Sequence, residues 1–408
     1  MEKSEKIVCQ EIEKENEPIR VLHVLGSVGL GGAESRIMDL FRVIDRNRVQ
    51  FDFLIHMNAE QYRKALEAGD DPTKPPYREP EYYDEEILAL GGRIYALPRF
   101  RIVNLPEYRK AIEDFFEKHH EYSVVQGHMT STAALYLPIA RKHGCGYTVA
   151  HARSAGVDQG AKGWATKLLR RDLWQKADQL FTCSDLARVA VFGDHPACFI
   201  PNAIRVELYR MDPQVRNEVR AGYGIREDEI VIGHAGRFHY AKNHEFLLKV
   251  FARVHRMNSR TVLLMMGDGP ERKAIEELAD RLEISDFCIF AGNRNEPWRE
   301  YMGMDFFLFP SRYEGLPGTL VEAQASGLPC LISDRIADEA VFSPNVYVKN
   351  LEEDVKDWAD CVLEHLDDAR IEGCEAAASA GFDVRSQAGD MERFYMDPGK
   401  ETLPGSGK

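Results

Sequence analysis

The chain has 408 residues and a formal net charge of −14, and this length predicts two domains instead of one core. The excess of acid argues against a duplex nucleic-acid partner, because binding to duplex DNA needs a basic face. Eight cysteines are scattered without a Cys-x-x-Cys pair. This pattern indicates reduced core thiols, and neither a disulfide framework nor a cysteine metal site.

Both ends of the chain differ in composition from the rest. Residues 1–18 mix charges without an apolar run, so we expect a flexible tail and no signal peptide. The Gly/Ser/Lys-rich residues 397–408 are expected to form a second tail. Because no apolar run approaches the length of a membrane-spanning helix, we expect a cytoplasmic protein.

Short β-rich runs alternate with helical segments along the whole chain. This alternation predicts an α/β fold with doubly wound parallel sheets and helices on both faces. The expected strands of the first half lie at 19–25, 51–56, 92–98, 123–128, 147–152 and 179–184, and those of the second half at 230–236, 261–267, 287–292, 305–310 and 328–333.

The second set of strands follows a linker at 201–214, which divides the chain. We expect a first domain over 19–200, a second over 201–380, and a C-terminal helix over 381–396 that crosses back to the first domain. Residues 58–83 hold four prolines and are too long for an ordinary connection. They are expected to form a surface insertion, and a substrate lid is one interpretation of it.

The first strand runs into a glycine loop with Gly29, Gly31 and Gly32, before a helix that is expected to begin near Ala33. Glycines at such a turn let backbone amides approach an anion at the helix N-terminus. Their spacing does not match the Gly-x-Gly-x-x-Gly fingerprint, which argues against a dinucleotide-dependent dehydrogenase.

The first strand of the second half is followed by Gly236 and Arg237, with Lys242 before the next helix. A planar guanidinium and an ammonium at one strand end suit a diphosphate, although solvated loop cations are the alternative. Gly267, in "GDGPE", marks another strand-to-helix turn, and parallel sheets bind ligands beyond these strand ends.

The stretch "RYEGLPGTLVEA" sets Glu314 and Glu322 on either side of a turn. The spacing Thr319-x-x-Glu322 is that of a capping box, which would need no ligand. Alternatively, the amides of Thr319, Leu320 and Val321 face a phosphate at the helix N-terminus. In that interpretation Glu322 accepts hydrogen bonds from a ribose, while Glu314 lies closer to a sugar.

A basic segment at 162–176 sets Lys167, Arg170, Arg171 and Trp174 on one side of an expected helix. Such a face is typical of peripheral contact with an anionic membrane. An ordinary solvated helix is the alternative, and the sequence leaves both open.

Taken together, these motifs resemble the retaining glycosyltransferases of the GT-B fold, in the large group 1 family with two glutamates seven residues apart. The resemblance covers about residues 19–396 and rests on Glu314 with Glu322, on the Gly-Arg sequence at Arg237 with Lys242, and on "GDGPE" and "GGAE". Within this family, the sequence is most similar to bacterial exopolysaccharide and capsule enzymes. The resemblance implies two Rossmann-like domains facing each other across a cleft.

The family resemblance also implies roles in the donor site. Arg237 and Lys242 would hold the donor diphosphate, Glu322 the ribose and Glu314 the hydroxyls of the transferred sugar. The expected donor-binding residues are Gly31, Gly32, Gly236, Arg237, Lys242, Gly267, Thr319, Leu320, Val321 and Glu322.

In the first domain, the resemblance places Gly31 and Gly32 near the donor phosphate and the acceptor. His151, in "YTVAHARSAG", matches the family's position at the reacting sugar, and His128, in "VVQGHMTS", competes with it for this role. The expected catalytic residues are therefore His151 together with Glu314, Arg237 and Lys242.

The implied reaction moves a hexose, with retention of configuration, from a nucleotide-diphosphate sugar to a carbohydrate or lipid-linked saccharide acceptor. A UDP-sugar is favoured over a GDP-sugar. No Asp-x-Asp triplet is present, so we expect no metal and no cofactor. The alternatives are a sugar-nucleotide or carbohydrate-binding protein without transfer activity, and a nucleotide-sugar epimerase.

Overall fold

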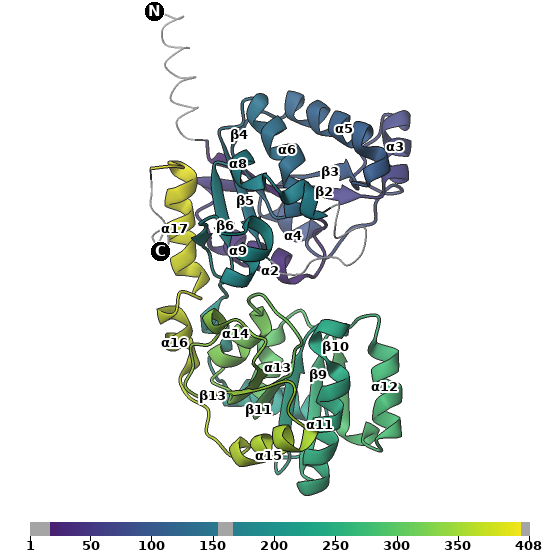
Figure 1. Cartoon of the computed structure of the whole chain (residues 1–408), viewed down its shortest axis with the longest axis vertical. Coiled ribbons are helices and arrows are strands. Elements are labelled where there is room, and N and C mark those ends of the chain that lie inside the picture. The colour runs from purple at the N-terminus through teal and green to yellow at the C-terminus, as the bar shows by residue number, and fades with distance from the viewer. Residues whose placement is uncertain (1–16, 154–165, 401–408) are drawn as a thin grey trace, which may run out of the picture. The chain divides into compact units, whose positions relative to one another are not determined.

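A computed structural model describes residues 17–153 and 166–400. The chain divides into two units, residues 1–201 with 384–408 and residues 202–383. Each unit holds one sheet in which every strand pair is parallel, with helices packed on it (Figure 1). The prediction of two doubly wound parallel-sheet domains is therefore confirmed.

The first unit contains a seven-stranded sheet in the order β3-β2-β1-β4-β5-β6-β7. Its strands are β1 (Ile19–Val24), β2 (Val49–Met57), β3 (Ile94–Pro98), β4 (Tyr122–Gly127), β5 (Tyr147–Ala152), β6 (Gln179–Thr182) and β7 (Cys198–Phe199). Its helices are α2 (Gly32–Val43), α3 (Ala59–Ala68), α4 (Asp84–Ala89), α5 (Leu105–Lys118), α6 (Thr130–Lys142), α8 (Leu173–Lys176), α9 (Asp185–Phe192) and α17 (Val384–Met396).

The second unit contains a six-stranded sheet in the order β10-β9-β8-β11-β12-β13. Its strands are β8 (Ile230–Ala235), β9 (Thr261–Met266), β10 (Cys288–Gly292), β11 (Phe306–Phe309), β12 (Cys330–Ser333) and β13 (Val346–Lys349). Its helices are α10 (Pro213–Gly222), α11 (His244–Met257), α12 (Arg272–Arg281), α13 (Pro297–Gly303), α14 (Gly318–Ala325), α15 (Val355–His365) and α16 (Gly373–Ser379).

Strand burial follows from the parallel pairing. Every residue of β2 and of β9 is buried, because helices cover both faces of a parallel sheet. Two strands were missing from the sequence prediction, β7 and β13. β7 has two residues, and β13 lies at the sheet edge and is only partly buried, so neither forms a continuous apolar run.

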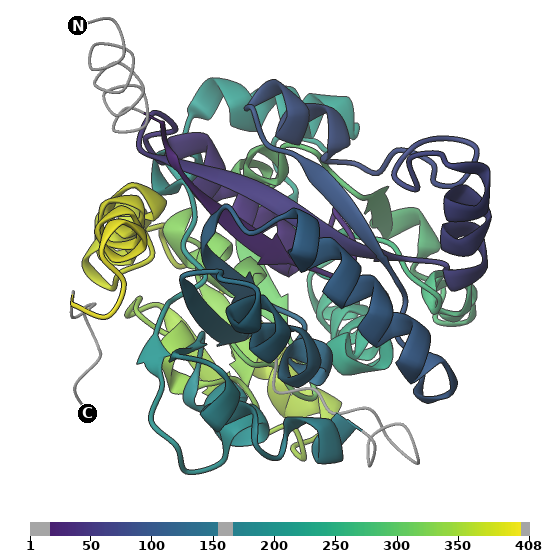
Figure 2. The same ribbon diagram turned by 90° about the horizontal axis from the view of Figure 1, so that it is seen from above.

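Helix α17 comes from the end of the chain but belongs to the first unit. It contacts α2, β1 and β2, which are purple in Figures 1 and 2, whereas α17 is yellow. Its residues Phe394 and Tyr395 are buried. The chain thus returns after the second unit and completes the core of the first.

The segment 58–83 begins with α3 and then continues as turns and irregular chain. The C-terminal end of this segment contacts the loop that follows β1. The Glu81 carboxylate accepts a hydrogen bond from the Val28 amide at 2.5 Å, and the Tyr83 amide donates to the Val28 carbonyl at 3.0 Å. Both backbone groups of Val28 are therefore fixed by this segment.

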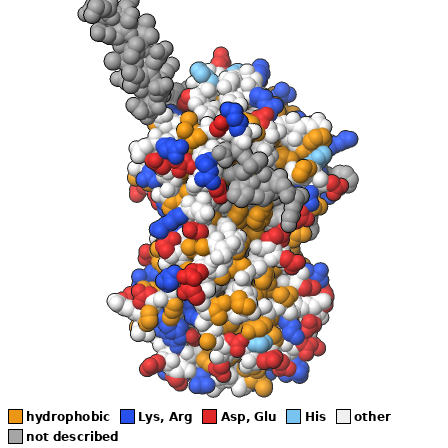
Figure 3. All heavy atoms as spheres, turned by 90° about the vertical axis from the view of Figure 1, so that its left-hand side faces the viewer, with side chains coloured by type: hydrophobic (Ala, Val, Ile, Leu, Met, Phe, Trp, Pro, Cys, Tyr) orange, Lys and Arg blue, Asp and Glu red, His pale blue; other side chains and the backbone are white. Residues whose placement is uncertain are grey.

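The surface carries charges of both signs. On the face drawn in Figure 3, acidic and basic side chains are interspersed. Within the two described ranges, we find no helix that combines the length and the apolar character needed to cross a bilayer.

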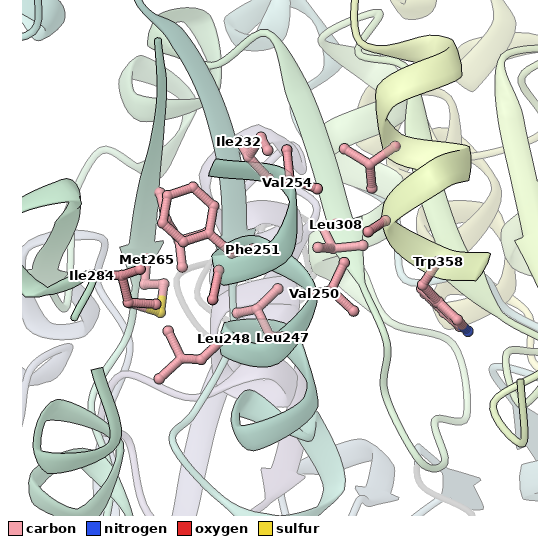
Figure 4. Close-up of a cluster of buried hydrophobic side chains, with 14 of the residues drawn as sticks. Ile232, Leu247, Leu248, Val250, Phe251, Val254, Met265, Ile284, Leu308 and Trp358 are labelled. Atoms are coloured by element: carbon pink, nitrogen blue, oxygen red, sulfur yellow. The ribbon is translucent and has the colours of Figure 1, made fainter. Parts of the chain in front are cut away.

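The core of the second unit lies where α11 and α15 pack on the sheet, and Figure 4 shows part of it. Helix α11 contributes apolar side chains at helical spacing to this cluster. Fully buried members include Ile232, Leu247, Leu248, Val250, Phe251, Val254, Met265, Leu308 and Trp358.

Truncating Leu248 tests this core. Leu248→Ala should lower the free energy of unfolding by about 2–5 kcal/mol, because a fully buried leucine leaves a cavity. Met257→Ala, at the exposed end of the same helix, is the matched control and should change it by less than about 0.5 kcal/mol. Urea unfolding measures both, and equal effects would contradict the assignment of the core.

Candidate functional site

In the second unit, the loops that follow β8 and β9 approach each other closely. Gly267 has φ +122°, and a Cβ there would lie 2.2 Å from the Gly236 carbonyl oxygen. A Cβ on Gly236 would in turn lie 2.9 Å from Lys242 Cδ. Glycine is required at position 267 because its φ is positive and a side chain would meet backbone atoms, whereas a side chain at position 236 would displace Lys242.

Lys242 and Glu314, which the sequence assigned to different parts of the donor, form an ion pair. Lys242 Nζ lies 2.7 Å from Glu314 Oε1, and both side chains are largely buried. The same ammonium lies 4.6 Å from the centre of the Phe309 ring, which adds a cation–π contact. Because β8 ends at Ala235 and β11 ends at Phe309, the ion pair lies beyond the carboxyl ends of these two strands.

Backbone contacts bring the two halves of this ion pair together. The Arg312 amide donates to the Ala241 carbonyl at 2.7 Å, and the Arg312 guanidinium donates to the Tyr240 carbonyl at 2.7 Å. The Asn243 side chain donates to the Pro310 carbonyl at 3.1 Å. These bonds hold the loop after β11 against the 3₁₀ turn Tyr240–Lys242, so the separation of Lys242 from Glu314 is fixed by the fold.

Arg237 follows β8 and is exposed. Within the described ranges, it makes no side-chain hydrogen bond or ion pair. Its guanidinium is therefore available to an anionic ligand, whereas Lys242 must first exchange Glu314 for that ligand.

Helix α14 begins at Gly318, and Pro317 is its N-cap residue. The capping-box interpretation of Thr319 and Glu322 is therefore wrong, because Thr319 lies inside the helix and makes no cap hydrogen bond. The amides of Leu320 and Val321 both approach the Pro317 carbonyl, at 3.1 and 3.3 Å. The prediction of three free amides is thus corrected: those of Leu320 and Val321 are engaged in the first helical turn.

Glu322 is buried, although it is charged in isolation. The Tyr301 hydroxyl donates to Glu322 Oε2 at 2.9 Å and lies 3.2 Å from the Thr319 carbonyl oxygen. The Thr319 hydroxyl is buried and, in the described part of the chain, has no hydrogen-bond partner. Tyr301 was not expected from the sequence, and its position on α13 offers no motif that would have indicated it.

In the first unit, Gly31 is the N-cap residue of α2 and Gly32 its first residue. A Cβ on Gly31 would lie 2.3 Å from Glu34 Oε2, whereas one on Gly32 would meet nothing within 4 Å. The Glu34 carboxylate therefore lies over the Gly31 side of the helix N-terminus, and burial raises its pKa. Gly32 leaves the other side uncovered.

His151 lies at the end of β5 and is fully buried. Its Nδ1 is 2.9 Å from the Gln126 side-chain nitrogen. The Tyr395 hydroxyl, from α17, donates to Gln126 Oε1 at 2.6 Å. His151 Nε2 has no hydrogen-bond partner among the described residues, and burial, with the nearby Arg153, lowers the His151 pKa well below its ordinary value.

His128, the competing candidate, belongs to the same cluster. Its ring centre lies 5.3 Å from that of His151. Arg153 Nε donates to His128 Nδ1 at 3.0 Å, and His128 Nε2 is 3.0 Å from His23 Nδ1. Burial lowers the pKa of His23 to about 3 and that of Arg153 to about 10.

The sequence analysis did not assign Gln126, Tyr395, His23 or Arg153. Gln126, His23 and Arg153 lie at strand ends, where the sheet topology brings them together, and this position is the signal that could have indicated them. Tyr395 gave no such signal, because its contact depends on the return of α17 to the first unit.

The predicted basic helix over 162–176 is wrong in its described part. A helical turn ends at Arg170, and α8 begins only at Leu173, while 162–165 lies outside the described residues. Trp174 stacks on His195, with ring centres 3.8 Å apart. The expected residues therefore do not share one continuous face, and the structure does not support a membrane-binding surface there.

Within residues 17–153 and 166–400, no group of three or more His, Cys, Asp or Glu side chains is arranged to hold a metal ion.

Comparison with known proteins matches both units to families. Residues 31–202 match the glycosyl transferase 4-like domain, and residues 215–381 match glycosyl transferases group 1. EpsF of Bacillus subtilis (strain 168), which is described as a glycosyltransferase, is 32% identical over 389 residues, covering 92% of this chain and 96% of EpsF. CapH of Staphylococcus aureus, described as a capsular polysaccharide biosynthesis glycosyltransferase, is 22% identical over 93% of this chain and 99% of CapH.

Among solved structures, HepE of Anabaena in complex with UDP and glucose aligns with a TM-score of 0.70 at 16% identity. The alignment covers 93% of this chain and all of HepE, and it shows a common GT-B fold. Together with the near full-length match to EpsF and the two family matches, these findings show that the chain belongs to the group 1 glycosyltransferases.

Proposed function

We propose that this glycosyltransferase moves a hexose, with retention of configuration, from a nucleotide-diphosphate sugar to a saccharide or lipid-linked saccharide. The observation that carries the proposal is the Lys242–Glu314 ion pair at the carboxyl edge of the second sheet, together with the exposed Arg237, which follows β8 at the same edge. Two cations and one carboxylate at this edge support the proposal, because parallel sheets generally bind ligands beyond the carboxyl ends of their strands.

Donor binding would rearrange this ion pair. The donor diphosphate brings negative charges that compete with Glu314 for Lys242, and Arg237 supplies the second cation. Once Glu314 is released, its carboxylate can accept hydrogen bonds from hydroxyls of the transferred sugar. One exchange would therefore fix the diphosphate and the sugar together.

Glu322, whose carboxylate already accepts from the Tyr301 hydroxyl, would also accept hydrogen bonds from the ribose. In the reaction, the bond from the anomeric carbon to the diphosphate oxygen breaks, and the acceptor oxygen forms the new bond on the same face. The acceptor proton passes to the leaving diphosphate. Arg237 and Lys242 would stabilise the charge that develops on this group.

A role in exopolysaccharide or capsule synthesis is supported by the full-length similarity to CapH, whose description names capsular polysaccharide biosynthesis. A UDP-sugar donor is supported by the similarity in fold to HepE, which was solved with UDP and with UDP-glucose. Turnover measured with a panel of UDP- and GDP-sugars tests the proposal, and no transfer or donor hydrolysis with any of them would contradict it.

Removing either donor-site cation should slow transfer. Arg237→Ala and Lys242→Ala should each lower kcat/KM by about ten- to a hundredfold, because a charge-assisted contact to the diphosphate is lost. Arg256→Ala is the matched control, since Arg256 is exposed at the opposite end of α11. Near-normal turnover of both variants would refute the diphosphate assignment.

Substitutions of Glu314 and of Glu322 should have different effects on product binding and on turnover. Glu322→Ala should weaken binding of the nucleoside diphosphate product, because a ribose contact is lost. Glu314→Ala should lower kcat yet keep or strengthen this binding, because it frees Lys242 for the diphosphate. Titration calorimetry measures both affinities, and equal losses in the two variants would show that the sugar and ribose roles are wrongly assigned.

Chelation should leave the reaction intact. The chain lacks the Asp-x-Asp triplet that presents a metal to donor phosphates. Protein treated with EDTA and then desalted should therefore retain its full transfer rate. A strict requirement for added manganese or magnesium would contradict this expectation.

A further inference from the structure

Three buried side chains from distant parts of the chain form a hydrogen-bonded series in the first unit. Gln126 on β4 pairs in register with Val149 on β5. His151 follows Val149 by two residues, so the side chains of Gln126 and His151 project from the same face of the sheet. Helix α17 contributes the Tyr395 hydroxyl, which donates to Gln126 Oε1, and the amide nitrogen of Gln126 contacts His151 Nδ1.

The first member of the series fixes the orientation of the second. Burial raises the pKa of Tyr395, so the phenol keeps its proton and donates it to Gln126 Oε1. The carboxamide of Gln126 is thereby oriented with its NH₂ group toward His151. This nitrogen has no lone pair to offer, so it can only donate.

The second member fixes the tautomer of the third. Because Gln126 donates to His151 Nδ1, this ring nitrogen must be the acceptor. A neutral imidazole carries its single proton on the other nitrogen, which here is Nε2. His151 Nε2 is buried and has no partner within 17–153 and 166–400, so its N–H group lacks the acceptor that a buried donor requires.

His128 does not have this free donor. Arg153, which can only donate, occupies His128 Nδ1, so His128 carries its proton on Nε2 and donates it to His23 Nδ1. His23 ends this second series, with its ring packed edge-on against Phe51 at 4.3 Å. Both ring nitrogens of His128 are therefore engaged, in contrast to those of His151.

We propose that Tyr395 and Gln126 are positioning residues that fix His151 as a neutral Nε2–H donor to an oxygen of the transferred sugar. This inference rests on the proposed function and deepens it. His151 then stabilises the bound sugar by donation and does not act as a general base, since Nδ1 is occupied and Nε2 has no lone pair. The C-terminal helix thereby sets the chemistry of a residue 244 positions earlier, counted as 395 − 151.

The tautomer can be observed without any activity. Full-length protein labelled with ¹⁵N-histidine should show His151 as the Nε2–H tautomer in long-range ¹H–¹⁵N spectra, with the signal assigned by its loss in His151→Gln. Tyr395→Phe should release the amide of Gln126 and give a mixture of tautomers. A wild-type His151 protonated on Nδ1 would overturn the proposal.

Gln126→Glu converts the donor into an acceptor and should reverse the tautomer. The carboxylate accepts from Nδ1–H and also raises the pKa of His151, which in the wild type is lowered by burial and by Arg153 and His23. Below this raised pKa the imidazolium still carries an Nε2 proton, and above it the Nε2–H donor is lost. The kcat of Gln126→Glu should therefore fall at least about tenfold from about pH 6 to about pH 9 relative to wild type.

Tyr147→Phe is the matched control, because Tyr147 also packs against α17 through Phe394 but, among the described residues, does not hydrogen-bond to the Gln126 side chain. It should leave the His151 signals and kcat unchanged. Tyr395→Phe should lower kcat about tenfold while nucleoside diphosphate affinity and thermal stability stay near wild type. Unchanged kcat and an unchanged pH profile in both Tyr395→Phe and Gln126→Glu would overturn the positioning role.

Failure of this inference differs from failure of the proposed function. If the tautomer changes as described but no nucleotide sugar supports transfer or hydrolysis, the hydrogen-bonded series stands and the function is wrong. If transfer occurs but His151 is protonated on Nδ1, the function stands and the series does not set the tautomer.

Discussion

Parallel strand pairing is the constraint on which the candidate site depends. Because all strands of a sheet run the same way, their carboxyl ends meet at one edge, and the loops that follow them lie side by side. In the second unit this edge collects Gly236, Lys242, Gly267 and Glu314 from three different strand ends. In the first unit it collects Gln126 and His151.

Close packing of these loops fixes the relative positions of the side chains that they carry. Gly267 and Gly236 allow one loop to rest on another, and backbone bonds from Arg312 join the loop after β11 to the turn that carries Lys242. The Lys242–Glu314 ion pair is therefore preformed, and in the proposed function each group would exchange this pairing for contact with a ligand. Such an arrangement keeps a buried cation paired until an anion replaces its partner.

In the first unit, hydrogen bonds and not an ion pair fix the buried side chains of the candidate site. Its cluster of histidines is neutral because burial lowers their pKa values, so hydrogen-bond donors and acceptors, and not net charge, decide what each ring nitrogen can do. Arg153 directs one series and Tyr395 the other. The return of α17 therefore contributes a hydrogen bond to this buried polar cluster in addition to its buried apolar surface.

The sequence by itself determined the features that depend on local pattern. Buried strands of a parallel sheet are rich in apolar residues, so β2, β9 and their neighbours were predictable. Glycines or cations directly after a strand indicated the candidate ligand-binding edge. The short strands β7 and β13 were missed because neither forms a continuous apolar run. The interruption after Arg170 was missed because helical spacing of charges does not reveal where a helix ends.

Only the tertiary structure decided which of these residues interact. The Lys242–Glu314 pair joins positions 72 residues apart, counted as 314 − 242, and the Tyr395–Gln126 bond joins positions 269 apart. The structure also showed that Pro317 is the N-cap residue of α14, which removes the capping role from Thr319. Pairings of this kind depend on chain topology and side-chain packing, which no local pattern encodes, and they determine which charges are neutralised and which donors are left for a substrate.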